Sequence, residues 1–211
     1  MNDTTPATTK RASAFVSREP ACLVLEDGRA FRGEAYGATG ETFGEAVFST
    51  GMTGYQETLT DPSFAGQIIT FTFPHIGNVG ANLEDVEAQN PFALGCIVRE
   101  DVTAPSNFRA VERLDGWMKR HARIGLAGVD TRALTRRIRA GGAPNGVVAH
   151  SPDGTFDLDA FAHRVVWNRN VQRIEMHLES LAPQTVRIEA GDRATPPSDR
   201  VRDPTGSPVS R

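Results

Sequence analysis

The alternation of apolar and polar residues predicts a chain built mainly from short β-strands. Residues 45–50 place Val47 on one face and Ala46 and Phe48 on the other, as expected of a half-buried strand. Residues 67–73 are denser in apolar side chains, which is typical of a strand buried on both faces. The pattern predicts further strands at 21–26, 29–36, 93–99, 123–129 and 146–150, the first two joined by a hairpin turn at Asp27-Gly28.

Two segments late in the chain have the period of a helix instead. The first covers residues 111–121, and its apolar face is formed by Leu114, Trp117, Met118 and His121. The second covers residues 131–140, with Asp130 as N-cap and Leu134 and Ile138 on its buried side, and it ends at Gly141-Gly142. Strands dominate, so the expected class is mixed α/β with a β-rich core and two short helices.

The connection between the two central strands, residues 51–66, has no apolar period and is expected to be an irregular crossing. Its sequence Asp61-Pro62-Ser63 is a strong turn signal, because Asp61 can accept hydrogen bonds from the amides that follow and Pro62 fixes φ. The Ser63 hydroxyl should therefore lie on a rigid corner. The residues alone favour an ordinary turn with a solvated serine, while long polar connections between good strands often carry function.

Length and composition allow one domain of usual size with polar extensions. Residues 21–150 form the expected domain, 1–20 a disordered arm, 151–190 a linker-like and weakly structured stretch with a short helix near 156–163, and 191–211 a disordered tail. A net charge of -3 over 211 residues gives no electrostatic reason to expect nucleic acid or an anionic membrane as a partner. The start has no signal-peptide core, so the expected location is the cytoplasm.

The residues that most often carry chemistry have simple structural interpretations here. Cys22 and Cys96 lie in apolar strands and are expected to be buried thiols, without a zinc site. The carboxylates Glu84, Asp85 and Glu87 are better interpreted as a solvated acidic edge than as a cation site.

Three other candidate groups also have structural interpretations. His75 follows a strand end and is expected to be a packed, hydrogen-bonded residue. The glycines of residues 37–40 do not form a dinucleotide-binding fingerprint. The second helix also carries four arginines, Arg132, Arg136, Arg137 and Arg139. These favour a solvated face or a partner contact over a phosphate or nucleic-acid patch.

Seven short motifs of the sequence together resemble one protein family. In chain order they are Leu23-Val24-Leu25-Glu26-Asp27-Gly28, Gly51-Met52-Thr53-Gly54-Tyr55-Gln56-Glu57, Leu59-Thr60-Asp61-Pro62-Ser63, Pro74-His75-Ile76-Gly77-Asn78, Ser106-Asn107-Phe108-Arg109, Asp130-Thr131-Arg132-Ala133-Leu134-Thr135-Arg136 and Asn145-Gly146. With this order and spacing, residues 21–163 closely resemble the N-terminal domain of the small, glutamine-hydrolysing subunit of carbamoyl-phosphate synthase.

The resemblance implies a β-rich domain of the swivelling β/β/α type. In that family the enzyme makes carbamoyl phosphate from glutamine, bicarbonate and ATP for pyrimidine and arginine biosynthesis. The small subunit releases ammonia, and the large subunit holds the ATP and metal, so no cofactor is expected in this chain. The N-terminal domain is mainly a contact surface for the large subunit. It supplies one serine to the glutamine site, which corresponds to Ser63 here, and no catalytic residue.

The resemblance does not extend to the glutaminase domain of the family, whose nucleophilic cysteine lies on a tight elbow beside glycine. Neither Cys22 nor Cys96 has such a context, so the chain is expected to be a truncated small subunit that does not hydrolyse glutamine. Two alternatives remain open. One is a non-catalytic interaction module that binds a large subunit or a separate glutaminase domain, and the other is a frameshifted product without function.

Overall fold

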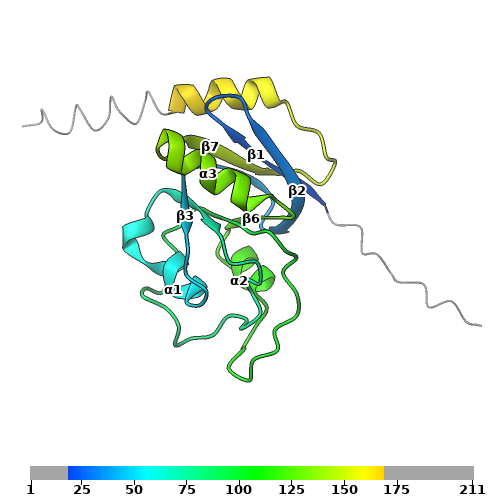
Figure 1. Ribbon diagram of the computed structural model, residues 1–211. Coiled ribbons are helices and arrows are strands. Elements are labelled where there is room, and N and C mark those ends of the chain that lie inside the picture. Colours follow the sequence, from blue (N-terminus) through cyan, green and yellow to red (C-terminus); the bar gives the residue numbers. More distant parts are fainter. Residues whose placement is uncertain (1–18, 169–211) are drawn as a thin grey trace, which may run out of the picture.

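The computed structural model describes residues 19–168, and its centre is a β-barrel (Figure 1). Seven strands of this part of the chain close the barrel in the order β1-β2-β6-β5-β4-β3-β7. Their bounds are β1 Pro20–Leu25, β2 Ala30–Gly37, β3 Gly40–Ser49, β4 Gln67–Phe71, β5 Gly95–Ile97, β6 Ile124–Ala127 and β7 Asn145–His150. The barrel follows the predicted strands closely, although β3 begins five residues earlier than the pattern indicates.

The barrel combines parallel and antiparallel pairing. The strands β3, β4, β5 and β6 pair in parallel, with Ala46 opposite Ile68, Ile68 opposite Gly95 and Gly95 opposite Ile124. The remaining pairs are antiparallel, and β7 closes the barrel because it pairs with both β1 and β3. The carboxyl ends of the four parallel strands therefore lie together at one end of the barrel.

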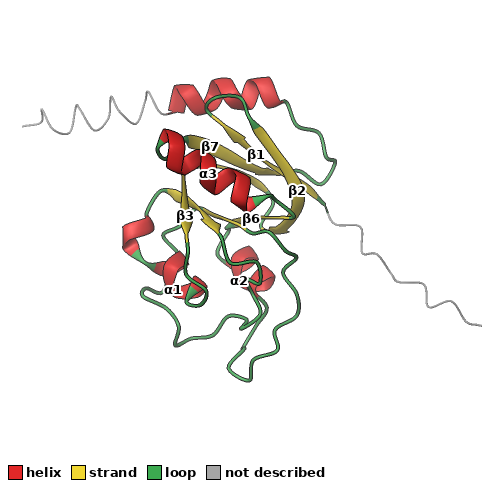
Figure 2. Cartoon of the chain, in the orientation of Figure 1, coloured by secondary structure: helices red, strands yellow, loops and turns green. Residues whose placement is uncertain are grey.

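Helices lie on the outside and at one end of this barrel (Figure 2). They are α1 Tyr55–Thr60, the 3-10 helix η1 Pro62–Phe64, α2 Leu114–Arg120, α3 Thr131–Gly141 and a helix over residues 158–168. The mixed α/β class is confirmed, but the expectation of two short helices was too low. The crossing after β3 was expected to be irregular, and it contains α1. This six-residue helix escaped notice because Gln56 and Thr60 on its buried side are polar.

The core consists of three packed clusters. The first fills the barrel with inward residues from all seven strands, including Leu23, Ala46 and Ile68, and α3 adds Leu134 and Ile138. The second packs the outer face of β4 and β5 against α1 and α2. The third packs β1 and β7 against the helix over residues 158–168. Burial of β4 on both faces, as predicted for its dense apolar run, follows from the first two clusters.

Several local predictions about the strands and helices are confirmed. Ala46 and Phe48 pack in the barrel interior while Val47 packs against the outer cluster, as the alternation predicts. The Asp130 side chain accepts a hydrogen bond from the Ala133 amide at 3.0 Å, and α3 ends at Gly142 with a φ of 83°. The helix predicted over residues 111–121 is shorter in the structure, where α2 begins at Leu114 and Val111 lies exposed outside it.

The stretch 151–190, expected to be weakly structured, contains the helix over residues 158–168 in its described part. Phe161 and Val165 of this helix are buried against β1 and β7. The predicted arm and tail lie almost entirely outside the described residues. None of the helices within residues 19–168 has both the length and the apolar composition needed to cross a bilayer.

A buried tyrosine fixes the pairing of β2 with β6. Tyr36 lies opposite Gly125, and its hydroxyl donates to the Cys96 carbonyl of the next strand at 3.1 Å. A Cβ added to Gly125 would lie 2.3 Å from the tyrosine ring. The ring therefore occupies the space that any side chain at Gly125 would need.

We predict that Gly125→Ala destabilises the protein by about 1–3 kcal/mol, because the buried ring must move out of its position. The matched control is Gly141→Ala at the end of α3, where an added Cβ meets nothing within 4 Å. This control should be neutral or stabilising by up to about 1 kcal/mol. Urea unfolding of both variants measures the difference, and equal midpoints for the two would contradict the predicted contact.

Candidate functional site: the connections around α1

Ser63 lies on a corner that is built by local hydrogen bonds. The Asp61 side chain accepts from the Ser63 amide at 2.8 Å, and the Asp61 carbonyl accepts from the Phe64 amide at 3.0 Å. Pro62 occupies the first position of η1, where its fixed φ suits the turn. The rigid corner that the sequence predicts is therefore confirmed. Ser63 is exposed there, so its hydroxyl is accessible to a molecule outside the barrel.

The helix α1 begins at a glycine with a left-handed backbone. Gly54 has a φ of 73°, a conformation that other residues adopt only with strain. Its carbonyl accepts from the Thr58 amide at 2.9 Å and from the Thr58 hydroxyl at 2.8 Å. This sharp entry turns the helix toward the long connection between β4 and β5.

Polar side chains of α1 hold that connection in place. The buried Gln56 amide donates to the Asn82 carbonyl at 2.8 Å and accepts from the Asn82 amide at 2.9 Å. The Thr60 hydroxyl donates to the Gln56 carbonyl and accepts from the Glu87 amide, both at 2.9 Å. The Gln56 side chain thus pairs with the backbone of Asn82 as a neighbouring strand would. Without such partners, these buried backbone groups would destabilise the folded protein.

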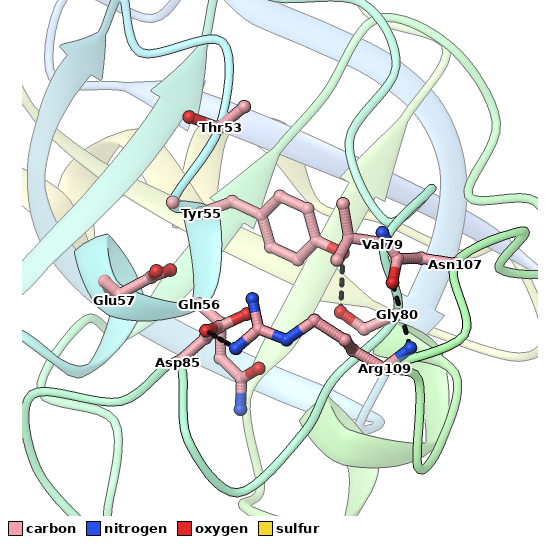
Figure 3. A pocket seen from close by; sticks show the side chains of 10 residues that line it. Thr53, Tyr55, Gln56, Glu57, Val79, Gly80, Asp85, Asn107 and Arg109 are labelled. Carbon is pink, nitrogen blue, oxygen red and sulfur yellow. Dashed lines mark hydrogen bonds and ion pairs between the residues drawn. The ribbon is translucent and has the colours of Figure 1, made fainter.

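Tyr55 attaches a second point of the same connection. Its hydroxyl donates to the Gly80 carbonyl at 2.5 Å, and Figure 3 shows the ring directed at that carbonyl. Burial raises the pKa of Tyr55 well above its ordinary value, so the phenol stays neutral. Gly80 has a φ of 80°, and a Cβ there would lie 2.6 Å from the Ala110 Cβ. The connection between β4 and β5 is therefore packed closely against the one between β5 and β6.

An arginine joins these two connections from outside. The Arg109 guanidinium donates to Asp85 at 2.6 Å, as Figure 3 shows. It also donates to Glu84 at 3.2 Å, and the two carboxylates raise the pKa of Arg109. Asn82 donates to the other oxygen of Asp85 at 2.7 Å. The prediction of a solvated acidic edge was wrong for Asp85, which is paired on both oxygens. The arginine that pairs with it lies 24 residues away in sequence, where no local pattern points to it.

These contacts surround a polar pocket of about 330 Å³. Its lining residues are Thr53, Gly54, Tyr55, Gln56, Glu57, Val79, Gly80, Asp85, Asn107 and Arg109. Ser63 is not among them. Because Asp85 already pairs with Arg109, the remaining charge of the lining residues is the carboxylate of Glu57.

The other predicted candidates lie apart from this pocket. Cys22 and Cys96 are free and fully buried, as expected, and burial raises the pKa of Cys22 to about 11 and that of Cys96 to about 12. His75 was expected to be packed, but it is exposed, and its ring lies edge-on to that of Phe73 with the centroids 6.0 Å apart. Within residues 19–168, no three His, Cys, Asp or Glu side chains are grouped to hold a metal ion.

Comparison with known proteins identifies the family. The family model described as carbamoyl-phosphate synthase small chain, CPSase domain, matches residues 23–148, which include nearly the whole barrel. The chain belongs to the carbamoyl-phosphate synthase small chain family. The resemblance seen in the sequence motifs is thereby confirmed.

Curated relatives agree with this assignment. The carbamoyl phosphate synthase small chain of Zymomonas mobilis is 66% identical over 138 residues, which are 65% of this chain and 37% of that protein. The same subunit of Brucella canis is 56% identical over 168 residues, which are 78% of this chain and 40% of that protein. The chain thus spans about two fifths of the length of the small chains it matches.

Two further matches carry less weight. A model for a SAM-dependent, histidine-specific methyltransferase matches residues 147–198, most of which lie outside the described residues. An aminopeptidase from Aneurinibacillus sp. strain AM-1 aligns at 16% identity and a TM-score of 0.37, over 64% of this chain and 31% of that protein. A TM-score this low supports no argument about the fold of this small-chain domain.

Several family motifs turn out to have structural roles that sequence reasoning missed. Gln56, Thr60 and Asn82 satisfy buried backbone groups, and Arg109 joins two connections. One available signal was the spacing of Tyr55 and Leu59, and of Gln56 and Thr60, each four residues apart as on one face of a helix. The residues that would meet these side chains could not be identified from the sequence alone.

Proposed function

We propose that this barrel acts as the N-terminal part of the small subunit of a glutamine-dependent carbamoyl-phosphate synthase. In this role it contacts the large subunit and contributes Ser63 to the glutamine site. The observation that carries the proposal is the family match over residues 23–148, which spans the barrel from β1 to β7. The name of the relatives, small chain, supports a heteromeric assembly with a larger subunit.

An exposed apolar surface supports the contact with the large subunit. Leu83, Phe108 and Val111 line one hollow of about 440 Å³ together with Arg109, and we call these three residues the Phe108 surface. Phe108 is 95% exposed and Leu83 is 81% exposed. Aromatic side chains surrounded by polar groups dominate the binding energy of protein interfaces. The hydrogen bonds that Tyr55, Gln56 and Thr60 of α1 make hold the connection between β4 and β5, which carries Leu83. Arg109 joins this connection to the one between β5 and β6, which carries Phe108 and Val111.

We predict that Phe108→Ser weakens binding to the carbamoyl-phosphate synthase large subunit from the same genome at least tenfold, as expected for an aromatic hot spot worth about 2 kcal/mol. Isothermal titration of the purified 211-residue chain against that subunit measures the affinity. The matched control is Trp167→Ser, which removes another exposed aromatic from the helix over residues 158–168.

The control variant should bind like the unmodified chain. No binding by the unmodified chain would contradict the proposed contact altogether. Equal weakening by both substitutions would instead show that the Phe108 surface is not the contact. Unfolding midpoints of the variants exclude a loss of fold as the cause, since both side chains are mostly exposed.

The proposal gives Ser63 a binding role and assigns the chemistry elsewhere. Glutamine hydrolysis by this family's route needs a thiolate, and the two cysteines of the 211 residues are buried thiols with raised pKa values. A polypeptide of these residues should therefore release no ammonia from glutamine. The Ser63 hydroxyl can contribute only beside a glutaminase domain, to which the exposed corner after Asp61-Pro62 would present it.

We predict that Ser63→Ala raises the glutamine KM up to about tenfold once a glutaminase domain is present, because one hydrogen bond is worth about 0.5–1.5 kcal/mol. A suitable enzyme is a chimaera in which residues 19–168 replace the matching part of the Brucella canis small chain, assayed for ammonia release with its large subunit. Ser151→Ala, in a turn beyond β7, is the control and should leave KM unchanged.

Two outcomes would count against this assignment. An unchanged KM in the Ser63 variant of an active chimaera would reduce Ser63 to a turn residue. Turnover by the 211-residue chain alone, abolished by Cys22→Ser or Cys96→Ser, would place the nucleophile inside the barrel domain.

A further inference from the structure

A second pocket, of about 380 Å³, lies where the four parallel strands end. Thr50 follows β3, Thr72 follows β4, Arg99 follows β5 by two residues, and Thr131 begins α3 after β6. In open α/β sheets and in (β/α)8 barrels, ligands bind outside the carboxyl ends of the parallel strands. The pocket lies at the corresponding end of the parallel strands of this barrel.

The charged side chains of this pocket are all arginines. Arg132, Arg136 and Arg139 come from α3, Arg99 comes from the connection after β5, and no carboxylate is among the lining residues. The Arg139 guanidinium lies over the Phe48 ring, 5.1 Å from its centroid, which holds it near the end of β3. The pocket therefore brings together positive charges from two separate parts of the chain.

The ion pairs known near this pocket leave its arginines largely unpaired. Arg137 of the same helix pairs with Asp27 and does not line the pocket. Arg99 has an ion pair with Glu100 at 3.6 Å, but both side chains are about half exposed, so water screens the pair. The sequence favoured a solvated face or a partner contact for the arginines of this helix. Arg132, Arg136 and Arg139 are indeed exposed, and all three also line this pocket.

A buried hydroxyl in the wall of the pocket is also left without a partner. Thr135 is only 7% exposed, and its Oγ1 is buried with no hydrogen bond. Such a group destabilises a folded protein unless something satisfies it. Thr135 lies one turn along α3 from Thr131, and both line the pocket. An acceptor oxygen of a ligand would complete the hydrogen bonding of Thr135 if it displaced the atoms that now cover Oγ1.

We propose that this pocket is a phosphate site, which takes inorganic phosphate or the phosphate group of a small metabolite. Planar guanidinium groups match phosphate oxygens with paired hydrogen bonds, and threonine hydroxyls add further donors. The first turn of α3 adds the positive end of the helix dipole, although Asp130 caps that turn. The volume suits a small molecule. Nothing in this site depends on glutamine or on the large subunit.

The direct test is titration of the 211-residue chain with sodium phosphate, with sodium chloride at equal ionic strength as reference. The expected result is saturable binding of phosphate, seen as a heat of binding and as a rise in the thermal unfolding midpoint beyond that in chloride. Arg136→Gln should weaken binding about ten- to a hundredfold, because it removes a hydrogen bond between charged groups. Arg137→Gln makes the same charge change on the same helix outside the pocket, and it should change affinity by less than about threefold.

Thr135→Val tests the hydroxyl separately from the charge. It should lower phosphate affinity about threefold to tenfold without lowering the unfolding midpoint in chloride, since it removes an unpartnered polar atom at nearly constant shape. Unchanged affinity in this variant would overturn the assignment of Thr135 as a ligand.

Two other results would overturn the phosphate site itself. One is that phosphate and chloride act alike at equal ionic strength, and the other is that Arg137→Gln weakens binding as much as Arg136→Gln. If phosphate does not bind but Arg136→Gln weakens association with the large subunit, the pocket is a protein contact instead. None of these outcomes changes the roles proposed for the Phe108 surface and for Ser63.

Discussion

The parallel pairing of β3, β4, β5 and β6 determines where every notable surface of this domain lies. Parallel neighbours cannot be joined by a tight hairpin, so each pair needs a crossover connection. The connections that leave β3, β4 and β5 pack against the outer face of the sheet and carry α1, the Phe108 surface and α2. The connection that leaves β6 leads directly into α3 at the end of the barrel. Both pockets discussed here are lined by residues of these connections.

Long connections are stable here because polar side chains replace regular secondary structure. The segment between β4 and β5 has no helix and no strand of its own, apart from a single bridge at Ala81. Its backbone groups are satisfied instead by Gln56 and Thr60 of α1, and Tyr55 attaches it at Gly80. Leaving such groups buried and unpaired would cost about 1–3 kcal/mol each. The family motifs that contain Tyr55, Gln56 and Thr60 therefore have a structural role, because they hold a connection that carries part of the Phe108 surface.

The sequence predicted features that depend on neighbouring residues. The alternation of Ala46 and Val47, the cap at Asp130 and the corner at Asp61 are local, and each is confirmed. It could not predict pairings between distant segments, such as Arg109 with Asp85, because the side chains meet only after the barrel closes. The basic pocket was missed for the same reason, since Arg99 joins the arginines of α3 only through the parallel strand order.

The central claim is that α1 makes the connection between β4 and β5 a rigid part of the core. Native-state hydrogen exchange of the isolated chain tests it directly at the amides of Asn82 and Glu87, which donate to Gln56 and Thr60. Both amides should exchange as slowly as the amides of β4, while exposed Leu83 between them exchanges rapidly. Exchange of Asn82 and Glu87 at the rate of Leu83 would contradict the account.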